Sequence, residues 1–180
     1  TVTASVSDKA GNPASADHNL TVDVTVPAVT IHTVAGDDVI NVAEHNQAQI
    51  ISGSATGAAA GDKVTVTIGG QTYTTVLDAA GNWSVGVPAN VISGLSDGTA
   101  TVSVSVTDAA GNTGSGTHNV TVDTGLPSVS FNAISDGNVL NAVEKGQDLS
   151  VSGTSANLAE GTLVTVTLNG KNYTATTAAD

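Results

Sequence analysis

The chain has 180 residues with no Cys or Met, and its 16 acidic residues against 4 basic ones give a formal net charge of −12. This balance excludes a nucleic-acid partner or an anionic lipid surface, because both need a basic face, and it favours a hard divalent cation such as calcium. The lack of Cys excludes a disulfide scaffold, and no apolar run approaches the ~20 residues that would insert into a membrane.

The sequence repeats itself at an offset of about one hundred residues. "VSDKAGN" at 6–12 aligns with "VTDAAGN" at 106–112, and "HNLTVD" at 18–23 aligns with "HNVTVD" at 118–123. "GDKVTVTIGGQTYT" at 61–74 aligns with "GTLVTVTLNGKNYT" at 161–174. A fixed period indicates a tandem array of like domains. We expect the C-terminal part of a preceding repeat at 1–25, a complete repeat at 26–125 and the N-terminal part of a following repeat at 126–180, all cut from a longer array.

Within the complete repeat, apolar and polar residues alternate with the period of two that is typical of strands with one buried face. Val102, Val104 and Val106, for example, alternate with Ser and Thr. Trp83 is the one large core candidate, and "GGQ" at 69–71 predicts a hairpin turn. The pattern predicts seven strands and an immunoglobulin-like β-sandwich, with the strands at about 28–34, 48–56, 63–68, 71–77, 82–87, 99–107 and 115–122.

Two kinds of short motif lie between these strands. Asn41 with Glu44 three residues on fits a helix N-terminal cap, so we expect at most one helical turn there. "DAAGN" occurs at 78–82 and at 108–112, with a near-copy, "DKAGN", at 8–12. In each, Asp can cap the backbone and Gly can supply a left-handed residue, which predicts a hairpin turn.

The acidic residues of the complete repeat fall almost entirely in the predicted loops, which alternate between the two ends of a sandwich. The end that faces the following repeat collects Asp37, Asp38, Glu44, Asp97 and the linker residue Asp123. The opposite end collects Asp62, Asp78 and Asp108, with Asp23 arriving from the preceding linker.

Carboxylates gathered in this way repel one another unless a cation lies among them, and calcium accepts six to eight oxygen ligands in loose geometry. Solvated loops are also where acidic residues normally lie, and the EF-hand and β-roll calcium motifs are absent. Residue placement alone leaves both interpretations open.

The ordered set "VDVTVPAVTIHTVAGDDVINVAE", "VTVTIGGQTYT", "GNWSVGVP" and "VSVTDAAGN" resembles the bacterial Ig-like repeats of giant adhesins that Gram-negative bacteria export by type I secretion. The resemblance covers the whole chain. It implies a rod of Ig-like domains at the cell surface, stiffened by calcium at domain junctions, whose neighbours are repeats of the same chain. The host-cell or biofilm ligand would then bind elsewhere in the full protein.

Carried over by position, the resemblance implies that calcium ligands come from seven residues: Asp37, Asp38, Glu44, Asp97 and Asp123 at the downstream junction, and Asp23 and Asp108 at the upstream one. One departure is that "GDDVIN" at 36–41 becomes "DGNVLN" at 136–141. This change shifts one carboxylate and replaces another with an amide, so successive junctions need not bind calcium equally.

The sequence also bears on three other functions. The pattern argues against an enzyme, since no set of catalytic groups converges and His18 and His118, which alternate with apolar residues, are expected to be partly buried strand residues. A glycan- or protein-binding module would need exposed aromatic residues, whereas Trp83 lies on an inward-patterned strand. A passive, calcium-independent spacer differs from the calcium-stiffened rod only in its response to metal removal.

Overall fold

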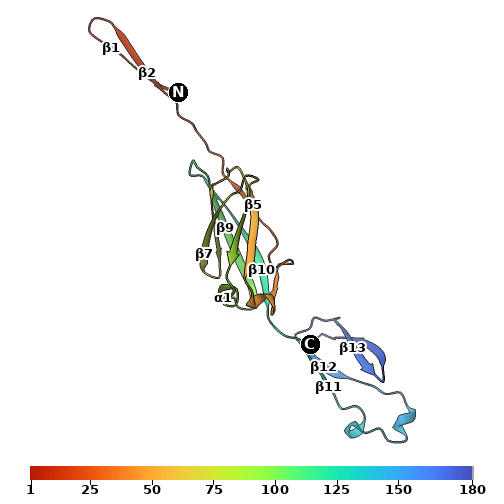
Figure 1. Ribbon diagram of the computed structural model, residues 1–180. Coiled ribbons are helices and arrows are strands. Elements are labelled where there is room, and N and C mark those ends of the chain that lie inside the picture. Colours follow the sequence, from red (N-terminus) through yellow and green to blue (C-terminus); the bar gives the residue numbers. More distant parts are fainter. Residues whose placement is uncertain (180) are drawn as a thin grey trace. The chain divides into compact units, whose positions relative to one another are not determined.

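The computed structural model describes residues 1–179, apart from the side chain of Asp136. By contacts the chain divides into a first unit, Thr1–Asp123, and a second unit, Thr124–Asp180, of which residues up to 179 are described. Figure 1 shows the ribbon with its elements labelled. The part from 26 to 125, called the central repeat below, carries the candidate site.

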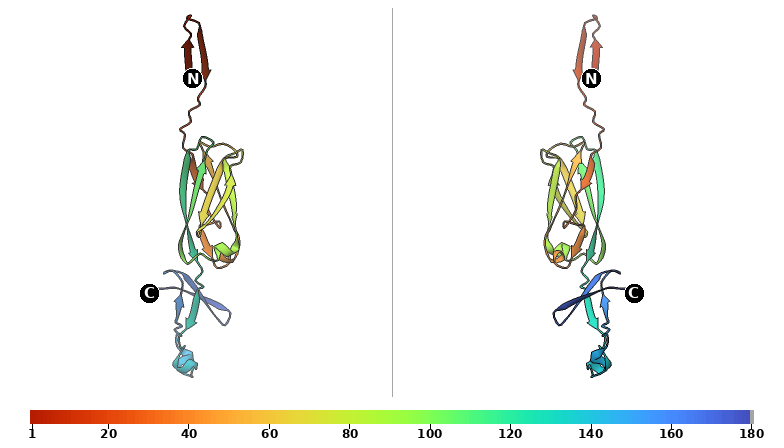
Figure 2. Two further views of the ribbon diagram at one scale, coloured as in Figure 1. Left: turned by 90° about the vertical axis from the view of Figure 1, so that its left-hand side faces the viewer. Right: turned by 90° about the vertical axis from the view of Figure 1, so that its right-hand side faces the viewer.

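The central repeat is an all-β sandwich of two sheets, as the sequence predicts (Figure 2). The three-stranded sheet has the order β3-β5-β8, and its strands are Ala28–Ile31, Gln49–Thr56 and Asn82–Val87. The five-stranded sheet has the order β4-β10-β9-β6-β7, and its strands are Val39–Asn41, Thr113–Asp123, Gly98–Thr107, Lys63–Ile68 and Gln71–Val76. Two packed sheets joined in this way form an immunoglobulin-like sandwich.

The segment 28–47, predicted as one strand followed by a loop, contributes one strand to each sheet. β3 ends at Ile31 and pairs antiparallel with β5, whereas β4 pairs parallel with the end of β10. The prediction of one continuous strand at 28–34 was therefore too long, and part of the segment predicted as a loop at 35–47 is a strand. The change of sheet takes place over Ala35 and Asp38, which both have left-handed backbone (φ 57° and 64°).

The inward positions of the two sheets form one core, as the alternation predicts. The core contains the valines of β6 and β9 together with Ile40, Ile51 and Trp83, which is only 3% exposed. Burying one such aliphatic or aromatic side chain contributes about 1.5–3 kcal/mol. Trp83 is thus a core residue, as predicted.

Two short helices lie at one end of the sandwich. The predicted turn is η1, Glu44–Asn46, but its N-cap position is Ala43, and Asn41, the predicted cap, lies just before it and bonds to it reciprocally. Asn41 Oδ1 accepts the backbone N–H groups of Ala43 and Glu44, and Glu44 Oε2 accepts the N–H of Asn41. The second, α1 at Ala89–Ile92, was not predicted, because four residues after Pro88 are too few to display a helical period.

The flanking parts are built from strand pairs that match their counterparts in the central repeat. β1 (Val2–Ser7) and β2 (Pro13–His18) form a hairpin, as β9 and β10 do. In the second unit, β11 (Ser128–Phe131) pairs with β12 (Gly153–Ala156), and β13 (Leu163–Leu168) pairs with β14 (Lys171–Thr176). Its helical turns are η2 (Asp136–Asn138) and η3 (Glu144–Gly146). The register Phe131↔Gly153 reproduces Ile31↔Gly53.

Candidate metal-binding ends of the central repeat

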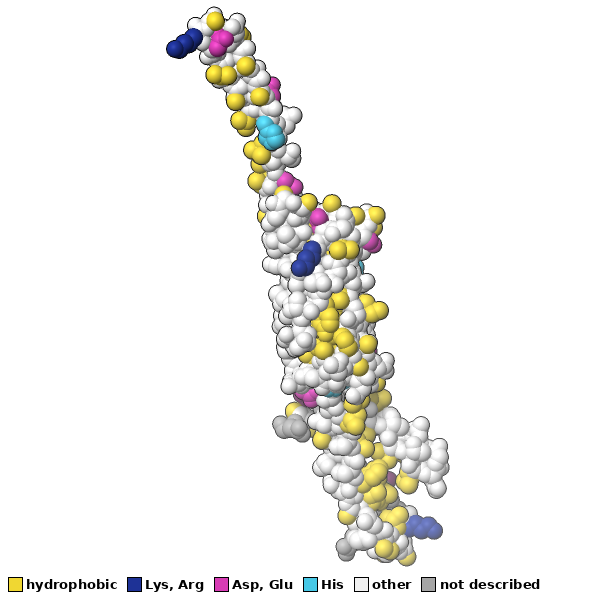
Figure 3. Space-filling view, turned by 60° about the vertical axis from the view of Figure 1, so that its left-hand side comes forward, with side chains coloured by type: hydrophobic (Ala, Val, Ile, Leu, Met, Phe, Trp, Pro, Cys, Tyr) yellow, Lys and Arg dark blue, Asp and Glu magenta, His cyan; other side chains and the backbone are white. Residues whose placement is uncertain are grey.

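The loops of the central repeat meet at two ends, as predicted. At the downstream end η1 contacts α1, and the ring of His45 makes a hydrogen bond to the carbonyl of Leu95 (2.9 Å). At the upstream end the backbones of Gly61 and Asp62 bond to Leu77. On the face in Figure 3, Asp and Glu side chains gather toward these two ends.

Asp38, at the downstream end, is bonded through both its carboxylate and its backbone carbonyl. Its Oδ1 accepts the backbone N–H of Val34 (2.8 Å) and lies 2.7 Å from Nε2 of His118 on β10. The backbone carbonyl of Asp38 accepts the N–H of Thr121, so the backbone of Asp38 is also bonded to β10. The hydrogen bond from His118 is the main reason why the pKa of Asp38 is lowered from 3.8. A metal ion at Asp38 would share this carboxyl group with His118.

Of the other downstream candidates, Glu44 is partly buried like Asp38, and Asp37, Asp97 and Asp123 are exposed. Asp37 Oδ1 accepts the N–H of Val39 (3.0 Å), and Glu44 caps Asn41. Asp97 lies in the loop after α1, and Asp123 is the last residue of β10. All five supply the hard oxygen atoms that calcium prefers.

At the upstream end, Asn112 connects Asp108 to the preceding linker. Its side-chain Nδ2 donates to Asp108 Oδ2 (2.9 Å) and to the backbone carbonyl of Asp23 (3.2 Å). Asp108 is 9% exposed, and the side-chain hydrogen bond from Asn112 is the main reason why its pKa is lowered. Asp23 uses its own Oδ1 to accept the N–H of Thr25 (2.9 Å). The side-chain amide of Asn112 therefore connects Asp108 to Asp23, the two predicted upstream candidates. The sequence pattern had indicated only that Asn112 belongs to the turn.

The two "DAAGN" motifs, at 78–82 and 108–112, and the related "DKAGN" motif at 8–12 share one turn geometry. This confirms the prediction that each motif forms a turn. In each, the Asp carboxylate accepts the N–H of the Asn four residues on, and the Gly has positive φ (80° to 93°). The turns at 8–12 and 108–112 close hairpins, as predicted. The turn at 78–82 does not, because it joins β7 to β8, which lie in different sheets.

No three His, Asp or Glu side chains among the described residues lie close enough together to hold a metal ion. The donor chemistry fits calcium, since the candidates are mostly exposed carboxylates and calcium also accepts backbone carbonyls and water. An ion at either end would need those further ligands. The seven-residue ligand set remains a prediction.

Two contacts of the candidate site were not predicted from the sequence, that of His118 with Asp38 and that of Asn112 with Asp23. The sequence contained a weak signal for His118. It lies on the same inner face of a strand as Val120 and Val122, where a polar ring needs a hydrogen-bond partner. It is half-buried, as expected, whereas His18 is exposed. For Asn112 the only signal was the recurrence of Asn at the same turn position.

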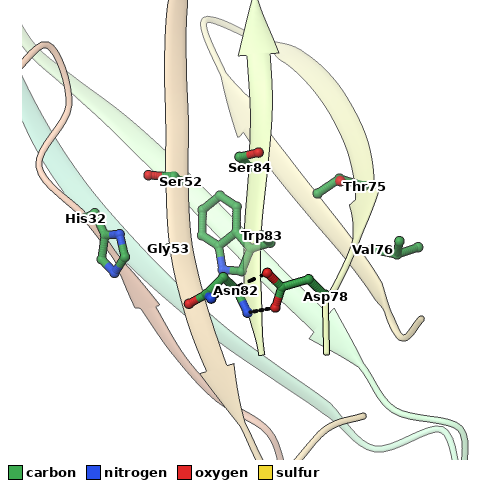
Figure 4. Close-up of a pocket in the computed structure, with 9 residues that line it drawn as sticks. All are labelled: His32, Ser52, Gly53, Thr75, Val76, Asp78, Asn82, Trp83 and Ser84. Atoms are coloured by element: carbon green, nitrogen blue, oxygen red, sulfur yellow. Dashed lines mark hydrogen bonds between the residues drawn. The ribbon is translucent and has the colours of Figure 1, made fainter. Parts of the chain in front are cut away.

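A shallow groove of about 370 Å³ lies beside Trp83 (Figure 4). Asp78 and Asn82 bond to each other there, and the indole packs under Gly53, where an added Cβ would lie 2.5 Å from the ring. The indole N–H is buried and has no hydrogen-bond partner in the described part of the chain. Because the ring itself is buried, it offers no exposed aromatic platform for a sugar. The groove is lined by His32, Ser52, Gly53, Thr75, Val76, Asp78, Asn82, Trp83 and Ser84.

Comparison with known proteins agrees with this architecture. The family model described as "Bacterial Ig-like domain" matches residues 25–124. The chain belongs to this family of bacterial Ig-like repeats. No helix in the described part of the chain is long and apolar enough to cross a membrane.

Two solved structures illustrate the likeness. One is a Ca²⁺-stabilized adhesin that helps an Antarctic bacterium reach out and bind ice, with 41% identity over 97% of this chain and 45% of that chain (TM-score 0.51). The other belongs to a 1.5-MDa bacterial ice-binding adhesin, with 36% identity over 98% of this chain and 59% of that chain (TM-score 0.51). The chain thus spans about half the length of these structures. A comparison with curated proteins finds no match.

Proposed function

We propose that this chain is a segment of the stalk of a large bacterial surface adhesin, where it separates an adhesive part from the cell. The observation that carries the proposal is its similarity to repeats of large bacterial adhesins over nearly its full length. Its role is structural, not catalytic. Its direct partners are neighbouring repeats, and the host-cell or biofilm ligand binds elsewhere in the full protein. The proposal includes an extracellular location and export by type I secretion, as the resemblance to giant adhesins implies.

The second part of the proposal is that calcium stabilises the repeats at their ends. Asp37, Asp38, Glu44, Asp97 and Asp123 would contribute downstream, and Asp23 and Asp108 upstream. The bound cation would offset repulsion between these carboxylates and so stiffen the rod. The description of one similar adhesin as Ca²⁺-stabilized and the gathering of acidic residues at both ends support this proposal.

The experiment is thermal unfolding of the full chain in excess calcium and in EGTA, with magnesium as the control cation. At a hundredfold excess over Kd a bound ion adds about 2.7 kcal/mol, which raises the Tm of a domain of this size by roughly 10 °C or more. Small-angle scattering should show a larger maximum dimension in calcium than in EGTA. Equal Tm values would exclude calcium and favour the passive spacer.

A further inference from the structure

Residues 23–27, called the linker below, lead from the preceding repeat into β3 and contact other parts of the central repeat. Pro27 is buried, although its neighbours Val26 and Ala28 are exposed. A Cβ added to Gly114 on β10 would lie only 1.7 Å from the carbonyl oxygen of Pro27. The backbone of the linker thus passes directly over a strand position that only glycine leaves open.

Two more contacts hold the segment before Pro27. The side-chain amide of Asn112 donates to the carbonyl of Asp23 (3.2 Å). A Cβ added to Gly57 would lie 3.2 Å from Cγ2 of Thr25 and 3.4 Å from the carbonyl of Val26. The linker from Asp23 to Pro27 is therefore fixed at both ends and is in close contact in between.

The second unit contains a related contact at the aligned position. Asn157, which aligns with Gly57 and shares its left-handed backbone (φ 56° and 75°), donates from Nδ2 to the carbonyl of Leu126 (2.9 Å). Leu126 aligns with Val26. Both repeats therefore contact the linker that enters them, with side-chain hydrogen bonds made from different loops.

We propose that the linker-contact surface formed by Gly57, Asn112 and Gly114 is a docking site for the linker of the preceding repeat, and that it restrains the entry to the central repeat independently of calcium. The proposal rests on the stalk function and adds a part that needs no metal. β10 ends at Asp123, and the aligned residue, Asp23, is the first whose carbonyl the next repeat binds.

The experiment is ¹⁵N relaxation on the full chain in EGTA, read at the amides of Thr25 and Val26. In the unmodified chain both should have order parameters near the rigid value of about 0.85. Asn112→Ala should lower them below about 0.6, the range of flexible backbone. Asn82→Ala is the matched control, because it removes the same side chain from the other DAAGN turn, which does not contact the linker.

Gly114→Ala tests the close approach of the backbone, with Gly86→Ala as its control, since a Cβ there meets nothing within 4 Å. Gly114→Ala should raise the mobility of Thr25 and Val26, and Gly86→Ala should leave it unchanged. Flexible linker amides in the unmodified chain, or equal effects of Asn82→Ala and Asn112→Ala, would overturn the proposal. Because all readings are made in EGTA, they are independent of the calcium test.

Discussion

Nε2 of His118 lies 2.7 Å from Oδ1 of Asp38, although the two residues are 80 positions apart in the sequence. The contact joins β10 to the segment that passes from one sheet to the other. Asp38 occupies this position with a left-handed backbone (φ 64°), a conformation that Asp and Asn tolerate better than most residues. The pair therefore fixes the point at which the chain changes sheets.

The following repeat provides a natural variant of this position. Asn138 replaces Asp38, keeps the left-handed backbone (φ 61°), and its Oδ1 accepts the N–H of Ile134 (2.9 Å) as Asp38 accepts that of Val34. We therefore predict that Asp38→Asn costs less stability than Asp38→Ala. The alanine variant leaves the Val34 N–H without this acceptor and should lose about 1–3 kcal/mol of unfolding free energy in urea titrations.

A separate readout isolates the contribution of His118. His118→Ala should destabilise the unmodified chain more than it destabilises the Asp38→Ala variant. In that variant His118 has already lost its carboxylate partner. Strictly additive effects of the two substitutions would show that the pair contributes nothing to stability.

Gly53 lies across from Trp83, and a second prediction concerns this pair. A Cβ at Gly53 would lie 2.0 Å from the carbonyl oxygen of Thr30 and 2.5 Å from the indole. Gly53→Ala should therefore force β3 away from β5 and destabilise the repeat by about 3 kcal/mol. The fluorescence of Trp83, the only tryptophan, reports unfolding directly. Gly86→Ala on the neighbouring strand is the control and should have a much smaller effect.

Much of this fold could be predicted because each long strand has one buried face. The alternation located β5, β6, β8 and β9 to within about two residues, since burial imposes it on the sequence. β4 could not be predicted, because three residues carry too little periodicity. Its parallel partner, β10, is about eighty residues away, and no local pattern encodes such a pairing.

The candidate site could be predicted only in part, for a similar reason. The sorting of acidic residues to two ends follows from strand order alone. The contacts Asp38–His118 and Asn112–Asp23 depend on backbone conformation at single residues and on packing across the sandwich, which sequence patterns do not specify. The turn at 78–82 has the same letters as that at 108–112, yet it joins different sheets, because local turn chemistry does not determine which strands pair.

The turn carboxylates predict an acid-sensitive contribution to stability. The backbone N–H of Asn82 is the main cause that lowers the pKa of Asp78 from its ordinary 3.8 in the folded chain. A lowered pKa contributes stability that is complete above the unfolded value and is lost as the pH falls through the folded value. Asp78→Asn should reduce stability at neutral pH but flatten its decline below about pH 4. Parallel pH profiles for the variant and the unmodified chain would contradict this assignment.

Asp37 offers the cleanest test of a calcium ligand. It is exposed, its Oδ1 accepts the N–H of Val39, and its counterpart in the next repeat is Gly137. Asp37→Asn keeps this acceptor and removes the charge, so unfolding in EGTA should change by less than about 0.5 kcal/mol. The rise in Tm on adding calcium should shrink, because a neutral amide binds calcium more weakly than a carboxylate. Asp17→Asn, on the exposed strand β2, removes an equal charge away from both ends and should leave the calcium response unchanged. An unaltered calcium response in Asp37→Asn would remove Asp37 from the ligand set.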